Sequence, residues 1–122
     1  MNKPIFKAGQ RFEYEVECAQ NIEITILAVY PAGTENANKD SNFYLIDSTN
    51  SGQDVQSELT ILQDLDLLKY PELLPSKVRK ILETYSEVDN YVGLNTLLSV
   101  LKPLGYAFDY YLDAVPYNLR KI

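Results

Sequence analysis

Histidine is absent from this 122-residue chain, and cysteine occurs once. The lack of histidine removes the commonest general base near neutral pH, the Ser-His and Cys-His nucleophile pairs, and the commonest zinc ligand. Cys18 cannot form a disulfide within the chain and stands where a strand needs an apolar residue, so we interpret it as a small buried hydrophobe. The sequence therefore predicts a protein that is not an enzyme and that binds no cofactor and no metal.

Long apolar runs are also lacking. None approaches the ~20 residues of a helix that spans a bilayer, and residues 1–10 are too polar for the apolar region of a signal peptide. The net charge of -6, from 17 acidic and 11 basic residues, disfavours non-specific binding to nucleic acid and to anionic lipid. We therefore expect a cytoplasmic protein with no membrane contact and no direct nucleic-acid binding.

The composition is that of an ordinary folded domain, with 46% hydrophobic and 23% charged residues. The length corresponds to one domain with one core. No internal repeat, low-complexity segment or shift in composition divides the chain. The sequence predicts a single domain that spans residues 1–122.

Alternation of apolar and polar residues predicts strands in the first half of the chain. It runs through residues 12–18 and again through residues 22–29, and the three residues between them are short enough for a β-hairpin turn. Residues 31–42 are rich in Pro, Gly, Asn and Asp, which is typical of a loop. A third strand is predicted at residues 43–48.

Helical spacing of apolar residues replaces this alternation after residue 53. It predicts a helix over residues 54–69 and a second helix that begins at Pro75 or Ser76. Ser86 and Asp89 are suitable caps for a third helix, which contains apolar residues up to position 101.

The predicted helical block ends at Pro103 and Gly105, because proline cannot continue a helix and glycine accepts the left-handed conformation that follows one. Alternation over residues 106–113 predicts a last strand, which we expect to pair with the sheet of the first half. The tail, residues 114–122, is either a strand extension or a short docking segment. The order βββ-ααα-β predicts an α+β fold with a mostly antiparallel sheet and helices packed on one face.

Acidic residues are concentrated between Phe12 and Leu68, where eleven acids stand against one base. In the predicted hairpin they occupy positions that face away from the core, and acids of the last strand join them if that strand pairs beside the hairpin. The predicted acidic face comprises Glu13, Glu15, Glu17, Glu23, Asp109, Tyr111 and Asp113. Such a face can bind a basic protein surface or imitate the phosphates of a nucleic acid, although a plain solvated strand has the same pattern.

The second predicted helix carries its charges in an unfavourable order. Lys77, Arg79 and Lys80 lie in its first turns and acids follow, whereas the helix dipole favours acids first and bases last. Two interpretations stay open: the three bases form a patch for an acidic partner or a phosphate, or they pair with the neighbouring acids Asp64, Asp66 or Glu72.

The chain contains ten tyrosines, a residue that is favoured at protein interfaces because it joins apolar area to a polar tip. Positions in the predicted apolar pattern assign half of them to the core: Tyr14, Tyr44, Tyr85, Tyr106 and Tyr110. The others are candidate surface anchors: Tyr30, Tyr70, Tyr91, Tyr111 and Tyr117.

These features favour a non-enzymatic module that binds another protein with a basic surface through the acidic face and exposed tyrosines. A regulator or inhibitor, of the type carried by phages and mobile elements, is a refinement of this hypothesis. One alternative is a small carboxylate- or metal-dependent hydrolase built on Asp109 and Asp113. Another is a homo-oligomer, such as a homodimer, with the helix of residues 54–69 as its contact.

Overall fold

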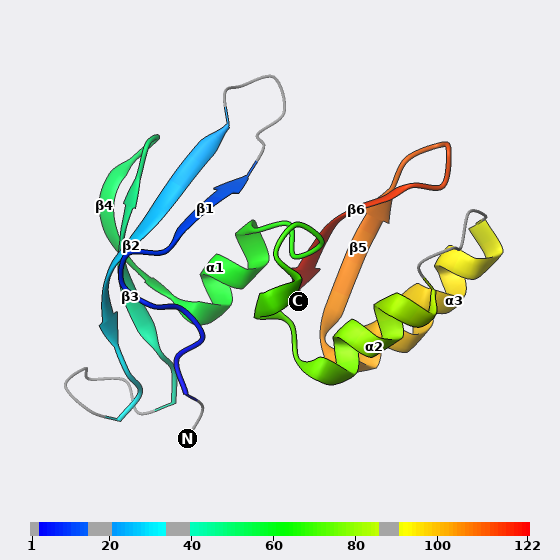
Figure 1. Ribbon diagram of the computed structural model, residues 1–122, viewed down its shortest axis with the longest axis horizontal. Coiled ribbons are helices and arrows are strands. Elements are labelled where there is room, and N and C mark those ends of the chain that lie inside the picture. Colours follow the sequence, from blue (N-terminus) through cyan, green and yellow to red (C-terminus); the bar gives the residue numbers. More distant parts are fainter. Residues whose placement is uncertain (1–2, 15–20, 34–39, 86–90) are drawn as a thin grey trace. The chain divides into compact units, whose positions relative to one another are not determined.

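The computed structural model describes residues 3–14, 21–33, 40–85 and 91–122 (Figure 1). The chain is an α+β protein in which a block of strands precedes the helices, as the sequence predicts. Its contacts divide it into two compact units, Met1–Asp64 and Leu65–Ile122. We refer to them as the N-terminal and the C-terminal unit.

The N-terminal unit is a four-stranded antiparallel sheet with strand order β1-β2-β3-β4, followed by one short helix. A β-bulge shifts the register of β2 between Ile26 and Ala28. The predicted third strand is confirmed as β3. The elements are β1 (Arg11–Tyr14), β2 (Ile22–Tyr30), β3 (Phe43–Ser48), β4 (Gly52–Ser57) and α1 (Glu58–Asp64).

The helix predicted over residues 54–69 is wrong at both ends: Gly52–Ser57 forms β4, and α1 ends at Asp64. Gly52 has a φ of 74°, a left-handed conformation that glycine adopts without strain and that here closes the turn from β3. The Ser57 hydroxyl then accepts a hydrogen bond from the Thr60 backbone N–H at 3.2 Å, which satisfies one of the first donors of α1. Val55 fits the helical spacing of the sequence, but its hydrogen-bonded neighbour is β3.

The core of the N-terminal unit lies on one face of this sheet. Phe6, from the arm before β1, packs edge-on against Phe12 and Tyr44, with ring centroids 5.3 Å and 5.1 Å away. Ile61 of α1 shares a small hollow with Ile24 and Ile46, so α1 covers the same face. The core of this unit also includes Ile26, which is fully buried.

A polar network around Glu58 fastens the N-terminal arm to this core. One carboxylate oxygen of Glu58, Oε1, accepts hydrogen bonds from the Tyr44 hydroxyl at 2.7 Å, the Asn42 side-chain amide at 3.2 Å and the Ile5 backbone N–H at 3.1 Å. Burial, together with the hydrogen bond to Glu58, raises the pKa of Tyr44. Tyr44 is therefore a neutral donor that anchors arm, sheet and helix to one another.

The C-terminal unit contains two helices and a two-stranded antiparallel sheet (Figure 1). The second helix begins at Ser76 after Pro75, as predicted, and Gly105 ends the helical block with a φ of 89°. The predicted caps Ser86 and Asp89 lie outside the described residues. The elements are a 3₁₀ turn (Pro71–Leu73), α2 (Ser76–Thr84), α3 (Tyr91–Leu101), a second 3₁₀ turn (Lys102–Leu104), β5 (Tyr106–Tyr110) and β6 (Pro116–Lys121).

The predicted pairing of the last strand with the N-terminal sheet is wrong, because β5 pairs with β6. The chain reverses directly after Tyr110: the Ala114 N–H bonds to the Tyr111 carbonyl at 2.9 Å, and the Tyr111 N–H bonds to the Val115 carbonyl at 3.0 Å. A turn this short costs little loop-closure entropy compared with pairing to a distant strand. The tail is thus an ordered strand, and the predicted strand over residues 106–113 ends at Tyr110.

The segment that opens the C-terminal unit holds the outer edge of β6. The Leu67 N–H donates to the Leu119 carbonyl at 2.7 Å, and the Leu119 N–H donates to Oδ1 of Asp66 at 3.1 Å. The same Asp66 oxygen accepts the Leu68 N–H at 3.0 Å. Leu67 and Leu119 are fully buried, so this contact belongs to the core of the unit.

Candidate functional site

Two residues of the predicted acidic face lie next to each other in the N-terminal sheet. Glu13 of β1 and Glu23 of β2 are directly opposite in the antiparallel register, one position away from the buried pair Phe12 and Ile24. Like charges in this position repel and weaken the strand pair. The other two members of this part of the face, Glu15 and Glu17, belong to residues 15–20, which lie outside the described part of the chain.

The remaining members, Asp109, Tyr111 and Asp113, belong to the C-terminal unit, where each has a local partner. Asp109 accepts a hydrogen bond from the Arg120 guanidinium at 3.1 Å. An oxygen of Asp113 accepts the Val115 N–H within the turn. The strand pairing that would place these residues beside the hairpin of Glu13 and Glu23 is absent from the described sheets.

The face of the N-terminal sheet that points away from its core combines charged and apolar residues. We call it the outer face, and the registers place Arg11, Glu13, Glu23, Thr25, Leu45, Asp47, Gln53 and Val55 on it. Its acidic end is the Glu13–Glu23 pair, and its apolar end is the cross-strand pair Leu45–Val55. Val55 lies on the edge strand β4 and is 52% exposed.

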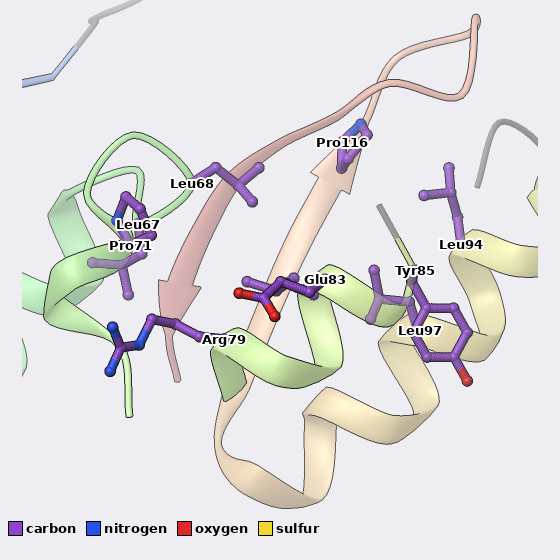
Figure 2. Close-up of a pocket in the computed structure, with 10 residues that line it drawn as sticks. Leu67, Leu68, Pro71, Arg79, Glu83, Tyr85, Leu94, Leu97 and Pro116 are labelled. Carbon is purple, nitrogen blue, oxygen red and sulfur yellow. The ribbon is translucent and has the colours of Figure 1, made fainter. Parts of the chain in front are cut away.

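The predicted basic patch lies on α2, and one of its members borders a cavity. Lys77, Arg79 and Lys80 are all exposed. The cavity has a volume of about 380 Å³ and belongs to the C-terminal unit (Figure 2). Its lining consists of Leu67, Leu68, Pro71, Arg79, Leu82, Glu83, Tyr85, Leu94, Leu97 and Pro116.

This cavity has the size and the apolar lining of a small-molecule site. Leucine and proline side chains from α2, α3, β6 and the segment before α2 form its walls, and the charged groups of Arg79 and Glu83 stand at one side of it (Figure 2). Sequence reasoning missed it, because Leu82, Leu94 and Leu97 have the spacing of ordinary core residues. The only sequence signal was the reversed charge order of α2, which places Arg79 beside the cavity.

The interpretation in which the basic residues of α2 pair with neighbouring acids is not supported within the C-terminal unit. Asp66 directs its Oδ1 at two backbone N–H groups. Among the described residues of this unit, Lys77, Arg79 and Lys80 have no ion pair with Asp66 or Glu72.

The tyrosines divide between core and surface only partly as predicted. Of the predicted surface anchors, Tyr91 and Tyr111 are exposed, and the other three, Tyr30, Tyr70 and Tyr117, are half-buried. The side chain of Tyr14 lies outside the described part of the chain. Tyr44 and Tyr106 are buried and Tyr85 is half-buried, whereas Tyr110, which was assigned to the core, is 36% exposed. The reason is its position at the end of β5, where its ring lies against Tyr91 of α3 at a centroid distance of 5.5 Å. Tyr111 stacks on Tyr117 at 4.1 Å. Much of the exposed tyrosine area is therefore used in contacts between tyrosines.

Two further classes of site receive no support from the described residues. No group of three or more His, Cys, Asp or Glu side chains among them could hold a metal ion. None of the helices within these ranges has the length and apolar character to cross a bilayer.

Comparison with known proteins identifies no relative of this chain. No protein-family model matches the chain, and neither a curated protein nor a solved structure matches it.

Proposed function

We propose that the chain is a small non-enzymatic interaction module that binds a basic amphipathic segment of another protein on the outer face of the N-terminal sheet. The observation that carries the proposal is the combination, on one sheet face, of a cross-strand glutamate pair with an apolar pair, the half-buried Leu45 and the exposed Val55. In this proposal the module acts on its partner as a regulator or inhibitor.

The glutamate pair supports this proposal because it places two carboxylates directly opposite each other on neighbouring strands of the outer face. Two acids held side by side attract a basic segment. Asp47 lies on the same face, where Arg11 is the one basic residue of the described strands. A cation-bearing segment is therefore favoured over an acidic one, and its charges would steer the encounter.

The apolar end of the face supplies the other half of the argument. Charge complementarity raises the association rate and selects the partner, but most binding energy comes from apolar side chains buried at the centre of an interface. Val55 and Leu45 are adjacent on neighbouring strands and can receive such side chains. A segment with basic residues on one part and apolar residues on the other fits both ends.

The experiment compares capture of a partner from native lysate by the wild-type protein and by matched variants. Glu13→Gln/Glu23→Gln and Val55→Ser change the outer face. Asp47→Asn and Asp54→Asn form a matched pair, since both remove one carboxylate from the β3–β4 hairpin, but the registers place Asp47 on the outer face and Asp54 on the opposite one.

We expect one stoichiometric partner, whose binding weakens about tenfold in Glu13→Gln/Glu23→Gln and in Val55→Ser, an effect of about 1.4 kcal/mol. Asp47→Asn should weaken binding, and this loss of affinity should be larger at lower salt. Asp54→Asn should bind as the wild type does. Equal binding by all variants, or the same loss in Asp47→Asn and Asp54→Asn, would rule out the outer face as the binding surface.

A further inference from the structure

The cavity belongs to the C-terminal unit, whereas the outer face belongs to the N-terminal unit, so the cavity needs an explanation of its own. Its volume of about 380 Å³ lies within the range of small-molecule sites. The walls include Leu94 and Leu97, which are 1% and 4% exposed, so the cavity reaches down to the core between α2 and α3.

The apolar part of the cavity determines what its ligand must contain. Hydrocarbon surface comes from Leu67, Leu68, Leu82 and Pro116. In Figure 2, Leu68 and Pro116 lie on the side of the cavity opposite α2. A hydrocarbon or aromatic body of matching size would gain free energy in proportion to the apolar area that it removes from water. A small hydrophilic ion would gain nothing from these walls.

The charged edge of the cavity determines what else the ligand must carry. The Arg79 guanidinium borders the cavity, and no described residue of this unit forms an ion pair or a side-chain hydrogen bond with it. Its planar group presents paired N–H donors that match a carboxylate. Lys77, Lys80 and the positive end of the α2 dipole add to the positive potential at this place.

Glu83 is the one acidic residue of the lining, one helical turn after Arg79. A single anionic group therefore has a favourable place only on the Arg79 side. This arrangement gives the site a direction, with the anion toward the start of α2 and the apolar body toward α3 and β6.

We infer that the cavity binds a small organic carboxylate with a large apolar body, held by Arg79 at its carboxylate. The class includes arylalkanoic acids and medium-chain fatty acids. The fit of apolar walls to the body and of Arg79 to the head carries the assignment. The inference does not depend on the proposed protein partner.

The test is a titration of the full chain, followed by two-dimensional NMR of backbone amides, with 3-phenylpropanoate and its neutral analogue 3-phenylpropan-1-ol. We expect saturable shifts in α2, α3 and residues 67–71, with a dissociation constant on the order of 1 mM or tighter for a ligand of this size. The alcohol should bind about tenfold more weakly, because it lacks the charge-assisted hydrogen bonds to Arg79. Inorganic phosphate at the same concentration should not compete.

Three variants locate the ligand and separate charge from fold. Arg79→Gln should weaken 3-phenylpropanoate about tenfold, whereas Lys80→Gln, which removes the same charge from the same helix, should weaken it less than about threefold. Leu68→Trp fills the cavity and should abolish binding of both ligands. If Leu68→Trp lowers the melting temperature, Leu82→Trp provides a second way to fill the same space.

Several results would overturn the inference. Equal affinity for the acid and the alcohol would show that Arg79 does not bind the carboxylate. Equal losses of affinity in Arg79→Gln and Lys80→Gln would show that Arg79 contributes only its positive charge and no specific contact. Competition by phosphate would show an anion patch without an apolar site. Failure of 3-phenylpropanoate to bind, combined with loss of a protein partner in Leu68→Trp, would assign the cavity to a protein interface instead.

Discussion

Replacing Asp66 with alanine should selectively loosen the C-terminal unit. The Asp66 carboxylate accepts two backbone N–H groups through one oxygen, from Leu68 at 3.0 Å and from Leu119 at 3.1 Å. The Leu119 bond joins β6 to the segment that opens the unit, over 53 positions of sequence. No other side chain in the described unit makes both of these connections.

The size of the effect follows from the burial of Leu119, which is 0% exposed. In Asp66→Ala its N–H loses its acceptor in a place that water does not reach, which costs about 1–3 kcal/mol, and the bond to Leu68 adds about 1 kcal/mol. The expected destabilisation is about 2–4 kcal/mol, and the melting temperature of the unit should fall by roughly 10–30 °C. Asp66→Asn keeps an oxygen acceptor at the same place and should lose about 1 kcal/mol or less.

Hydrogen exchange of the Leu119 amide, measured with thermal unfolding, tests this reasoning. Exchange at Leu119 should accelerate strongly in Asp66→Ala and slightly in Asp66→Asn, while amides of β2 and β3 keep their protection. Glu72→Ala is the control, since Glu72 is an exposed acid of the same unit and should change stability by less than about 0.5 kcal/mol. Unchanged protection of Leu119 in Asp66→Ala would refute the role of the carboxylate.

Three further predictions concern single side chains. Gly105→Ala should cost about 1–2 kcal/mol in chemical denaturation, because Gly105 has a φ of 89° and a Cβ there would lie 2.8 Å from Nζ of Lys121; an unchanged midpoint would contradict this. Tyr44→Phe should destabilise the N-terminal unit by about 1–2 kcal/mol, because the hydrogen bond to Glu58 is lost. Hydrogen exchange of the backbone amides in the N-terminal arm should become faster. A variant as stable as the wild type would show that the fold does not need this network. Burial raises the pKa of Asp64 above its usual 3.8, so the folded state binds this proton more tightly than the unfolded state does. The stability that protonation of Asp64 adds to the folded state is fully present at pH values below 3.8 and is lost as the pH rises through the raised pKa. Asp64→Asn should therefore be more stable than the wild type at pH 7 and lose this advantage near pH 3, which denaturation at both pH values measures.

The features that were predicted correctly are those that a few neighbouring residues control. Pro75 and Ser76 start α2 because a proline is tolerated only at the beginning of a helix, and Gly105 ends the helical block because it alone accepts the required left-handed conformation without strain. The strand β3 was predicted from alternation over six residues. These are local preferences that act before any distant contact forms.

The features that were missed depend on partners far along the chain or on the shape of a packed interior. Val55 satisfies both a helical and a strand pattern, and only the neighbouring β3 decides between them. The sequence leaves the tail open between a strand extension and a docking segment, and the pairing of the tail with β5 decides for the strand. The cavity is invisible in sequence because spacing shows that Leu94 and Leu97 point inward, but not whether other side chains fill the space beside them.

The sequence by itself determined the α+β class, the order of strands before helices, the start of α2, the end of the helical block at Gly105, and the absence of histidine. The tertiary structure decided which strands pair, that β5 takes its neighbour from the tail rather than from the first sheet, and that Arg79 borders an apolar cavity. The physical reason is that backbone preference and periodicity are properties of short segments, whereas register, strand partners and unfilled volume arise from the free energy of packing the chain against itself.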